Sequence, residues 1–196
     1  MEIRRLEIPE LKLITPKRFG DDRGYFQEAW SEKRFRQNVQ DIGFVQDNQS
    51  LSVSKGTLRG LHFQKPPFAQ GKLVRVLRGA IADIVVDIRK GSPTYGKHIS
   101  VRLDAKEGAQ IWVPPGFLHG FCTLEENTEV FYKVTAYYSA AHDAGVLWND
   151  PALGIDWPVD ARSVVLSDKD KMLPRLQEVP ELFYYEERSQ ELGARS

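Results

Sequence analysis

The sequence has 196 residues, of which 41% are hydrophobic, and its 27 Lys and Arg residues balance 27 Asp and Glu residues. This composition is sufficient for a buried core and excludes a disordered chain, and the balanced charge gives no indication of nucleic acid or an anionic membrane as a partner. Cys122 is the single cysteine, which excludes an internal disulfide. Because the first residues, MEIRRLEIPE, lack a long apolar run, we expect a cytoplasmic protein without a membrane span.

One helix is predicted in the first third of the chain, over SEKRFRQNVQDIG (31–43). Ser31 is a suitable N-cap, Phe35, Val39 and Ile42 share one helical face, and Gly43 is the expected stop. The next segment, KGTLRGLHFQ (55–64), has the apolar character of a buried strand but contains Arg59 and His62.

The middle of the chain consists mainly of predicted strands. Segments 72–79, 80–91, 97–103, 109–116 and 128–139 are rich in β-branched or aromatic residues and end at turn-forming residues. No G-x-G-x-x-G stretch and no alternation of strand and helix accompany them, which argues against a nucleotide-binding parallel sheet. The pattern predicts an all-β sandwich or jelly roll with a few short helices. We expect one domain over 1–180 and a charged tail or short helix over 181–196.

The residues able to carry chemistry lie on these strands and on the loops between them. Alternation places His62 and Gln64 on one face of their strand, so Arg59 joins them only if the strand ends or bulges there. Lys72 opens the next strand. His119 is expected in a loop, within PPGFLHGF.

Two further strands contain polar side chains at inward positions. Tyr132 shares a face with Val134, so this tyrosine can line a pocket, and Tyr138 follows the same strand. Asp83 and Asp87 share one face of a strand that is otherwise apolar, so at least one of them should have a buried partner.

Each of these residues also has a purely structural interpretation. A histidine among apolar residues is often a hydrogen-bonded core residue, and strand tyrosines often only pack. His62 and His119 could be metal ligands, but a stable site needs three or four converging donors, and the same-face neighbour of His62 is Gln64, so no metal is expected. Apolar neighbours favour a buried, inert thiol for Cys122.

Six stretches stand out between about residue 13 and residue 174: FGDDRGYFQEAW, FVQDNQSLSVSKGTLRGLHFQ, QGKLVRVLRGAIADIVVDIRKGSPTYG, WVPPGFLHGF, FYKVTAYYS and GVLWNDPALGIDWP. Together they resemble a known family, the dTDP-4-dehydrorhamnose 3,5-epimerases. The resemblance implies a cupin-type jelly roll that works as a homodimer without metal or cofactor. It also implies epimerisation of dTDP-4-dehydro-6-deoxy-D-glucose at carbons 3 and 5, which yields dTDP-4-dehydro-L-rhamnose.

The resemblance also implies roles for individual residues. His62 is then the catalytic base, Asp170 its carboxylate partner, Tyr132 the general acid and Lys72 the cation that stabilises the enolate oxygen. Several relatives have glutamate where this chain has Asp143, and part of the nucleotide pocket comes from the second subunit of the dimer. The residues implied in substrate binding are Phe19, Arg23, Glu28, Gln46, Asn48, Arg59, His119, Tyr138, Asp143 and Lys169.

Two other functions stay open at this point. A single-centre epimerase or a keto-isomerase acting on a related 4-keto nucleotide sugar would share the nucleotide-binding residues. A non-catalytic sugar-binding jelly roll would keep the aromatic residues but lose the base, and the presence of both His62 and Asp170 counts against it.

Overall fold

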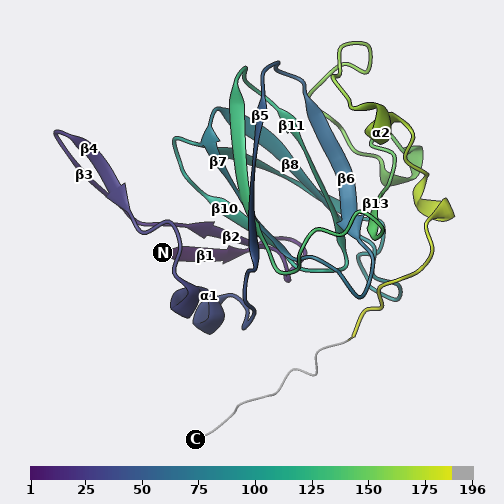
Figure 1. Ribbon diagram of the computed structural model, residues 1–196, viewed down its shortest axis with the longest axis horizontal. Coiled ribbons are helices and arrows are strands. Elements are labelled where there is room, and N and C mark those ends of the chain that lie inside the picture. The colour runs from purple at the N-terminus through teal and green to yellow at the C-terminus, as the bar shows by residue number, and fades with distance from the viewer. Residues whose placement is uncertain (187–196) are drawn as a thin grey trace, which may run out of the picture.

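A computed structural model describes residues 1–186, which form two β-sheets that face each other (Figure 1). Every strand pairing in both sheets is antiparallel, which confirms the predicted jelly roll. The first sheet contains, in spatial order, β1 (Glu2–Arg5), β2 (Lys12–Thr15), β10 (Gln110–Val113), β7 (Lys72–Arg78), β12 (Thr128–Val134) and β5 (Gln46–Ser52). The second contains β13 (Asp143–Gly145), β6 (Leu58–Gln64), β11 (Phe117–Thr123), β8 (Ala80–Asp87) and β9 (His98–Asp104).

In the described part of the chain, a hairpin and four short helical segments accompany the two sheets. The hairpin, formed by β3 (Arg18–Asp21) and β4 (Gly24–Gln27), projects away from both sheets (Figure 1). The helical segments are α1 (Glu32–Asn38), α2 (Asp168–Lys171) and the 3₁₀ turns Pro151–Leu153 and Leu176–Glu178. Within residues 1–186, no helix has the length and apolar character needed to cross a membrane.

Alternation along β8 shows how the chain divides its apolar residues between two cores. Ile81 and Val85 belong to the core between the sheets, whereas Ile84 and Val86 belong to a second core on the outer face of the five-stranded sheet. Burial of each such side chain is worth about 1.5–3 kcal/mol. Any polar residue in phase with Ile81 therefore lies on the inner face, between the sheets.

Both outer faces are covered by irregular or helical segments. Phe35 of α1 packs edge-to-face against Trp112 of the six-stranded sheet, with ring centroids 5.2 Å apart. On the other sheet, Trp148 and Trp157 from the segment after β13 join the second core. The same segment leads into α2, which Figure 1 places beside β6.

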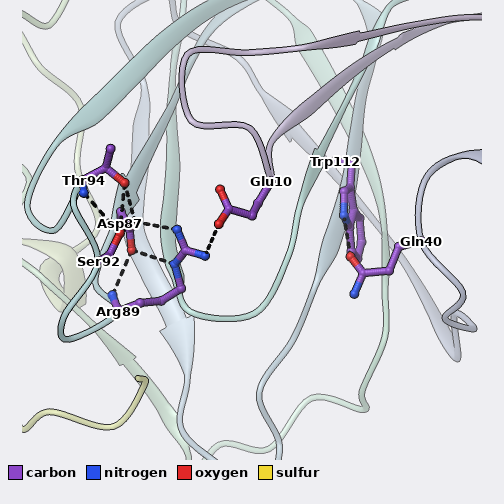
Figure 2. A network of polar contacts seen from close by, with 7 residues as sticks. All are labelled: Glu10, Gln40, Asp87, Arg89, Ser92, Thr94 and Trp112. Carbon is purple, nitrogen blue, oxygen red and sulfur yellow. Dashed lines mark hydrogen bonds and ion pairs between the residues drawn. The ribbon is translucent and has the colours of Figure 1, made fainter. Parts of the chain in front are cut away.

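Helix α1 begins as predicted and ends earlier. The side chain of Ser31 caps the first turn, but the chain leaves the helical path after Val39 and not at Gly43. The next residue explains the early end, because the side chain of Gln40 accepts a hydrogen bond of 3.2 Å from the indole nitrogen of Trp112 (Figure 2).

Residues 181–186 form an extended segment beside Lys90. The backbone nitrogen of Lys90 donates to the carbonyl of Phe183 at 2.8 Å, and that of Tyr185 donates to the carbonyl of Lys90 at 2.9 Å. The part of the predicted tail or helix over 187–196 lies outside the described residues.

A buried ion pair closes the end of β8. The fully buried carboxylate of Asp87 accepts hydrogen bonds from the guanidinium of Arg89 at 2.9 and 2.7 Å and from the hydroxyls of Ser92 and Thr94 at 2.7 Å each (Figure 2). Arg89 also reaches Glu10 near the N-terminus at 2.6 Å. Burial would raise the pKa of Asp87, but these hydrogen bonds hold it below its usual range.

We expect Asp87→Asn to lower the free energy of unfolding by about 3 kcal/mol at pH 7, because it removes one member of a buried pair. The Asp87 carboxylate contributes stability above its unfolded pKa, and this contribution is lost as the pH falls through the lower folded value. The difference between variant and wild type should therefore shrink below about pH 4. Urea unfolding at several pH values measures it, and an equal loss at pH 3 and pH 7 would contradict the assignment.

Candidate active site

The two sheets and the segment around α2 line a cavity of about 420 Å³. The five-stranded sheet supplies Arg59, His62 and His119, and the six-stranded sheet supplies Lys72 and Tyr132. Lys72, His119 and Tyr132 are in phase with the inner-face apolar rows of their strands, so alternation places them between the sheets.

The imidazole of His62 is held by a buried carboxylate. Nε2 of His62 lies 2.7 Å from Oδ1 of Asp170, which is 3% exposed, and Oδ2 of Asp170 accepts a hydrogen bond of 3.4 Å from the backbone of Gly60. Burial would raise the pKa of Asp170, but the hydrogen bond and charge of His62 together with the Gly60 N–H lower it below its usual range. Asp170 is therefore a carboxylate that accepts the Nε2 proton of His62.

Helix α2 places Asp170 against the strand. The side chain of Ser167 caps this helix by accepting a hydrogen bond from the backbone nitrogen of Asp170 at 3.1 Å. The capping of α2 by Ser167 was not predicted from the sequence. The Ser-x-x-Asp spacing of Ser167 and Asp170 is an N-cap pattern that could have indicated it.

A bulge in β6 brings Arg59 and His62 into the same cavity. The register to β11 shifts, so that Arg59 and His62, three residues apart, face Phe121 and His119, which are two residues apart. The bulge that the sequence analysis required for Arg59 is thus present. Gly60 lies within it at φ +136°, where a Cβ atom would lie 2.6 Å from Cα of Gly120.

The opposite wall contributes an amine and a phenol. Among residues 1–186, neither Nζ of Lys72 nor the hydroxyl of Tyr132 has a hydrogen-bond partner, so both groups are available to a ligand. Burial lowers the pKa of Lys72 to about 8, although the charges of Asp143 and Asp83 oppose this fall. Burial also raises the pKa of Tyr132, which keeps the phenol protonated.

His119 lies in the middle of β11 and not in a loop as predicted. The turn ends at Gly116, and the next seven residues form a fully buried strand between β6 and β8. Because both faces of this strand are covered, it lacks the polar and apolar alternation that would have indicated it. Nε2 of His119 lies 2.8 Å from Oδ2 of Asp83, which supplies the buried partner expected for one of the two strand aspartates.

A second cavity, of about 320 Å³, shares His62, Lys72 and Tyr132 with the first. Its remaining polar lining includes four residues of the predicted binding set, Gln46, Asn48, Tyr138 and Asp143.

Asp143 is the centre of the contacts at this second cavity. Its Oδ2 accepts a hydrogen bond of 3.1 Å from the phenol of Tyr138 and forms an ion pair with Lys169. The negative charge of Asp143 raises the pKa of Tyr138. Lys169, next to Asp170 on α2, is thereby linked to β13.

Three residues of the predicted binding set lie away from both cavities. Phe19 and Arg23 belong to the β3–β4 hairpin, which projects from the sheets (Figure 1). Phe19 is 56% exposed, and Arg23 pairs with Asp21. Glu28 follows the hairpin and pairs with Arg34 at 3.4 Å. A single chain therefore does not bring these three residues to the site.

Cys122 is buried and takes no part in either cavity. Burial raises the pKa of its thiol to about 11, in agreement with the predicted inert cysteine. In the described part of the chain, no three His, Cys, Asp or Glu side chains converge as a candidate metal site.

The fold and the site together define a jelly-roll protein whose inner cavity holds groups suited to acid–base chemistry. A family model for dTDP-4-dehydrorhamnose 3,5-epimerase matches residues 5–178. The chain is 58% identical over 185 residues to the dTDP-4-dehydrorhamnose 3,5-epimerase of Sinorhizobium fredii, and the match covers 94% of each chain. The chain belongs to the dTDP-4-dehydrorhamnose 3,5-epimerase family.

Solved structures agree with this assignment. The crystal structure of a dTDP-6-deoxy-D-glucose-3,5-epimerase from Legionella pneumophila, in complex with dTDP-4-keto-L-rhamnose, is 43% identical with a TM-score of 0.89, over 94% of this chain and 98% of that one. A 3′-monoepimerase from Streptomyces bikiniensis, in complex with dTDP-quinovose, is 33% identical with a TM-score of 0.81, over 88% and 87% of the two chains. The enzyme is thus similar both to a 3,5-epimerase and to a 3′-monoepimerase.

We expect Lys72→Met to raise the free energy of unfolding at pH 7 by about 1 kcal/mol, because the fold no longer has to desolvate an ammonium group. Since the folded pKa of Lys72 is about 8, below its usual value, wild-type stability should gain from this group as the pH rises from 8 towards 10.5. The variant should lack this gain. Lys133→Met, which removes a lysine paired with Asp47 at 2.9 Å outside the cavity, is the matched control and should change stability by less than about 1 kcal/mol. Denaturant unfolding measures both, and destabilisation by Lys72→Met would contradict the prediction.

Proposed function

We propose that this enzyme inverts carbons 3 and 5 of dTDP-4-dehydro-6-deoxy-D-glucose and so forms dTDP-4-dehydro-L-rhamnose. One observation carries the proposal: His62 and Tyr132 stand on opposite sheets and line the same cavity. A sugar ring held between the two sheets then presents one face to a base and the other face to an acid.

The chemistry needs a base, a charge acceptor and an acid. His62 removes the proton from the carbon beside the ketone, and the C–H electron pair moves into a new C=C bond while the carbonyl electrons move onto the ketone oxygen. The ammonium of Lys72 stabilises the negative charge of the resulting enolate oxygen. A metal ion could supply the same positive charge. Tyr132 then donates a proton to the opposite face of the carbon, the ketone re-forms, and solvent restores both groups.

Asp170 supports the base. A buried carboxylate that accepts the Nε2 proton fixes the tautomer of His62 and leaves Nδ1 as the nitrogen able to take the substrate proton. It also stabilises the imidazolium that forms after abstraction. His62 and Asp170 thus form the catalytic pair of this proposal, with Lys72 and Tyr132 as the other two catalytic residues.

The nucleotide end of the substrate is assigned to the second cavity and its rim. Gln46, Asn48 and Tyr138 line this cavity, and Asp143 with Lys169 bounds it. Arg59 and His119 line the first cavity and are assigned to the sugar and its diphosphate.

We propose a cytoplasmic homodimer, with residues 1–180 as one domain. The hairpin that carries Phe19 and Arg23 has three exposed aromatic residues, Phe19, Tyr25 and Phe26. An isolated monomer rarely retains such a group of exposed rings. Phe19, Arg23 and Glu28 are assigned to the nucleotide site of the second subunit.

Inversion at carbon 3 alone is the second candidate, because a 3′-monoepimerase is among the structural relatives. Both activities use the same base and acid. They differ in which carbon lies within reach of His62 and Tyr132, so they are separated by measuring each carbon independently.

Proton NMR of dTDP-4-dehydro-6-deoxy-D-glucose in deuterated water tests the proposal. The wild type should introduce deuterium at carbons 3 and 5 and form the L-configured product, whereas exchange at carbon 3 alone would support the monoepimerase. His62→Asn should lower the rate of exchange at both carbons by about 10²- to 10⁴-fold. The matched control is His98→Asn, since His98 lies on the edge strand β9 and bonds the carbonyl of Leu153 at 3.0 Å. Near-normal exchange in His62→Asn would require another base.

A further inference from the structure

Asp83 is a buried carboxylate in which only one of the two oxygens has a hydrogen-bond partner among residues 1–186. It lies on β8 between Ile81 and Val85, is 0% exposed, and accepts one hydrogen bond at Oδ2 from His119. Its Oδ1 is buried and has no partner among residues 1–186. An unpaired buried carboxylate oxygen destabilises a fold, so a residue kept only for stability should not show one.

The other buried aspartate of the same strand shows the difference. Asp87 has the same exposure of 0% but uses both oxygens, with Arg89, Ser92 and Thr94 as donors (Figure 2). Its network lies at the strand end and none of its members lines either cavity. Asp87 therefore serves as the structural reference for Asp83.

Asp83 determines which nitrogen of His119 is available to a ligand. Because a carboxylate only accepts, Nε2 of His119 must carry the proton in the 2.8 Å contact. Nδ1 has no hydrogen-bond partner in the described part of the chain, and His119 lines the first cavity, as Lys72 does from the facing sheet. In the neutral ring, Nδ1 is then a hydrogen-bond acceptor that suits a sugar hydroxyl.

Asp83 also acts on Lys72 from the facing sheet. Burial lowers the pKa of Lys72 to about 8, the charges of Asp143 and Asp83 oppose the fall, and that of Lys169 adds to it. The other titratable or charged groups around the cavity are Arg59 and His62 on β6, Tyr132 on β12 and Asp170 on α2.

We propose that Asp83 is a positioning residue for the reaction: it holds His119 as an acceptor for a hydroxyl of the sugar and supports the ammonium charge of Lys72 that receives the enolate. This inference rests on the proposed function. Without Asp83, the ring of His119 could rotate or change tautomer, and the sugar would lose its alignment with His62 and Tyr132.

Two substitutions separate the two effects. Asp83→Asn keeps an acceptor for His119 but removes the charge, so the alkaline limb of the kcat profile should move to lower pH because Lys72 loses its proton earlier. Asp83→Val suits the apolar surroundings, so it should fold, and it removes the acceptor as well. We expect it to lower kcat by about 10- to 100-fold, the range found when a partner that orients a histidine is lost. KM should change less than kcat.

The control is Asp87→Asn, which should lose stability but keep the wild-type dependence of kcat on pH. The ¹⁵N chemical shifts of the His119 ring provide a readout without turnover: the Nε2–H tautomer should dominate in the wild type and Asp83→Asn and be lost in Asp83→Val. An inactive wild type would defeat the proposed function, while the ¹⁵N shifts would still test the hold of Asp83 on His119. Unchanged kcat, pH profile and ¹⁵N shifts in both Asp83 variants would overturn the inference.

Discussion

The hydrogen bond between His62 and Asp170 joins two segments that are 108 residues apart, and the site depends on it. It connects His62, near the C-terminal end of β6, with α2, a helix of four residues that could not be stable alone. Because the carboxylate is buried, the hydrogen bond stabilises the fold most when Nε2–H of His62 donates to it. The same contact therefore attaches α2 to the five-stranded sheet and prepares the imidazole for proton transfer.

The site combines several charges that the fold has to desolvate. Lys72 is cationic and unpaired within residues 1–186, and Asp83 leaves one carboxylate oxygen unpaired. Each costs folding free energy, and each is useful only when a ligand brings negative charge or hydroxyl groups into the cavity. This cost in folding free energy is offset by stabilising contacts that lie outside the cavity. They are the apolar cores on both sides of the five-stranded sheet and the ion pair between Asp87 and Arg89.

Periodicity in the sequence was sufficient to predict the part of the site that follows regular strands. Tyr132 lines the cavity because it lies on the same strand face as the buried Val130 and Val134. His62 shares the inner face of β6 with Gln64 because these two residues are also two positions apart. Gln64 itself is a structural amide, since it bonds the backbone of Phe68 and Ser139 at 2.7 Å each.

Other parts could not be predicted because they depend on contacts between distant segments. The strand around His119 is buried on both faces and has no alternation, so it resembled a loop after the two prolines. The pairing of Asp83 with His119 requires the register between β8 and β11, which no local pattern encodes. The position of Phe19, Arg23 and Glu28 relative to a nucleotide depends on a second subunit and is not determined by one chain.

The central claim is that protons leave one face of the sugar and return on the other, and Tyr132→Phe in deuterated water tests it most directly. If Tyr132 is the acid, His62 can still remove a proton and return deuterium to the same face. The variant should then introduce deuterium at carbon 3 or carbon 5 with strongly reduced formation of the L-configured product. A wild-type rate of product formation would contradict the account, because the proton on the second face would have to come from another group.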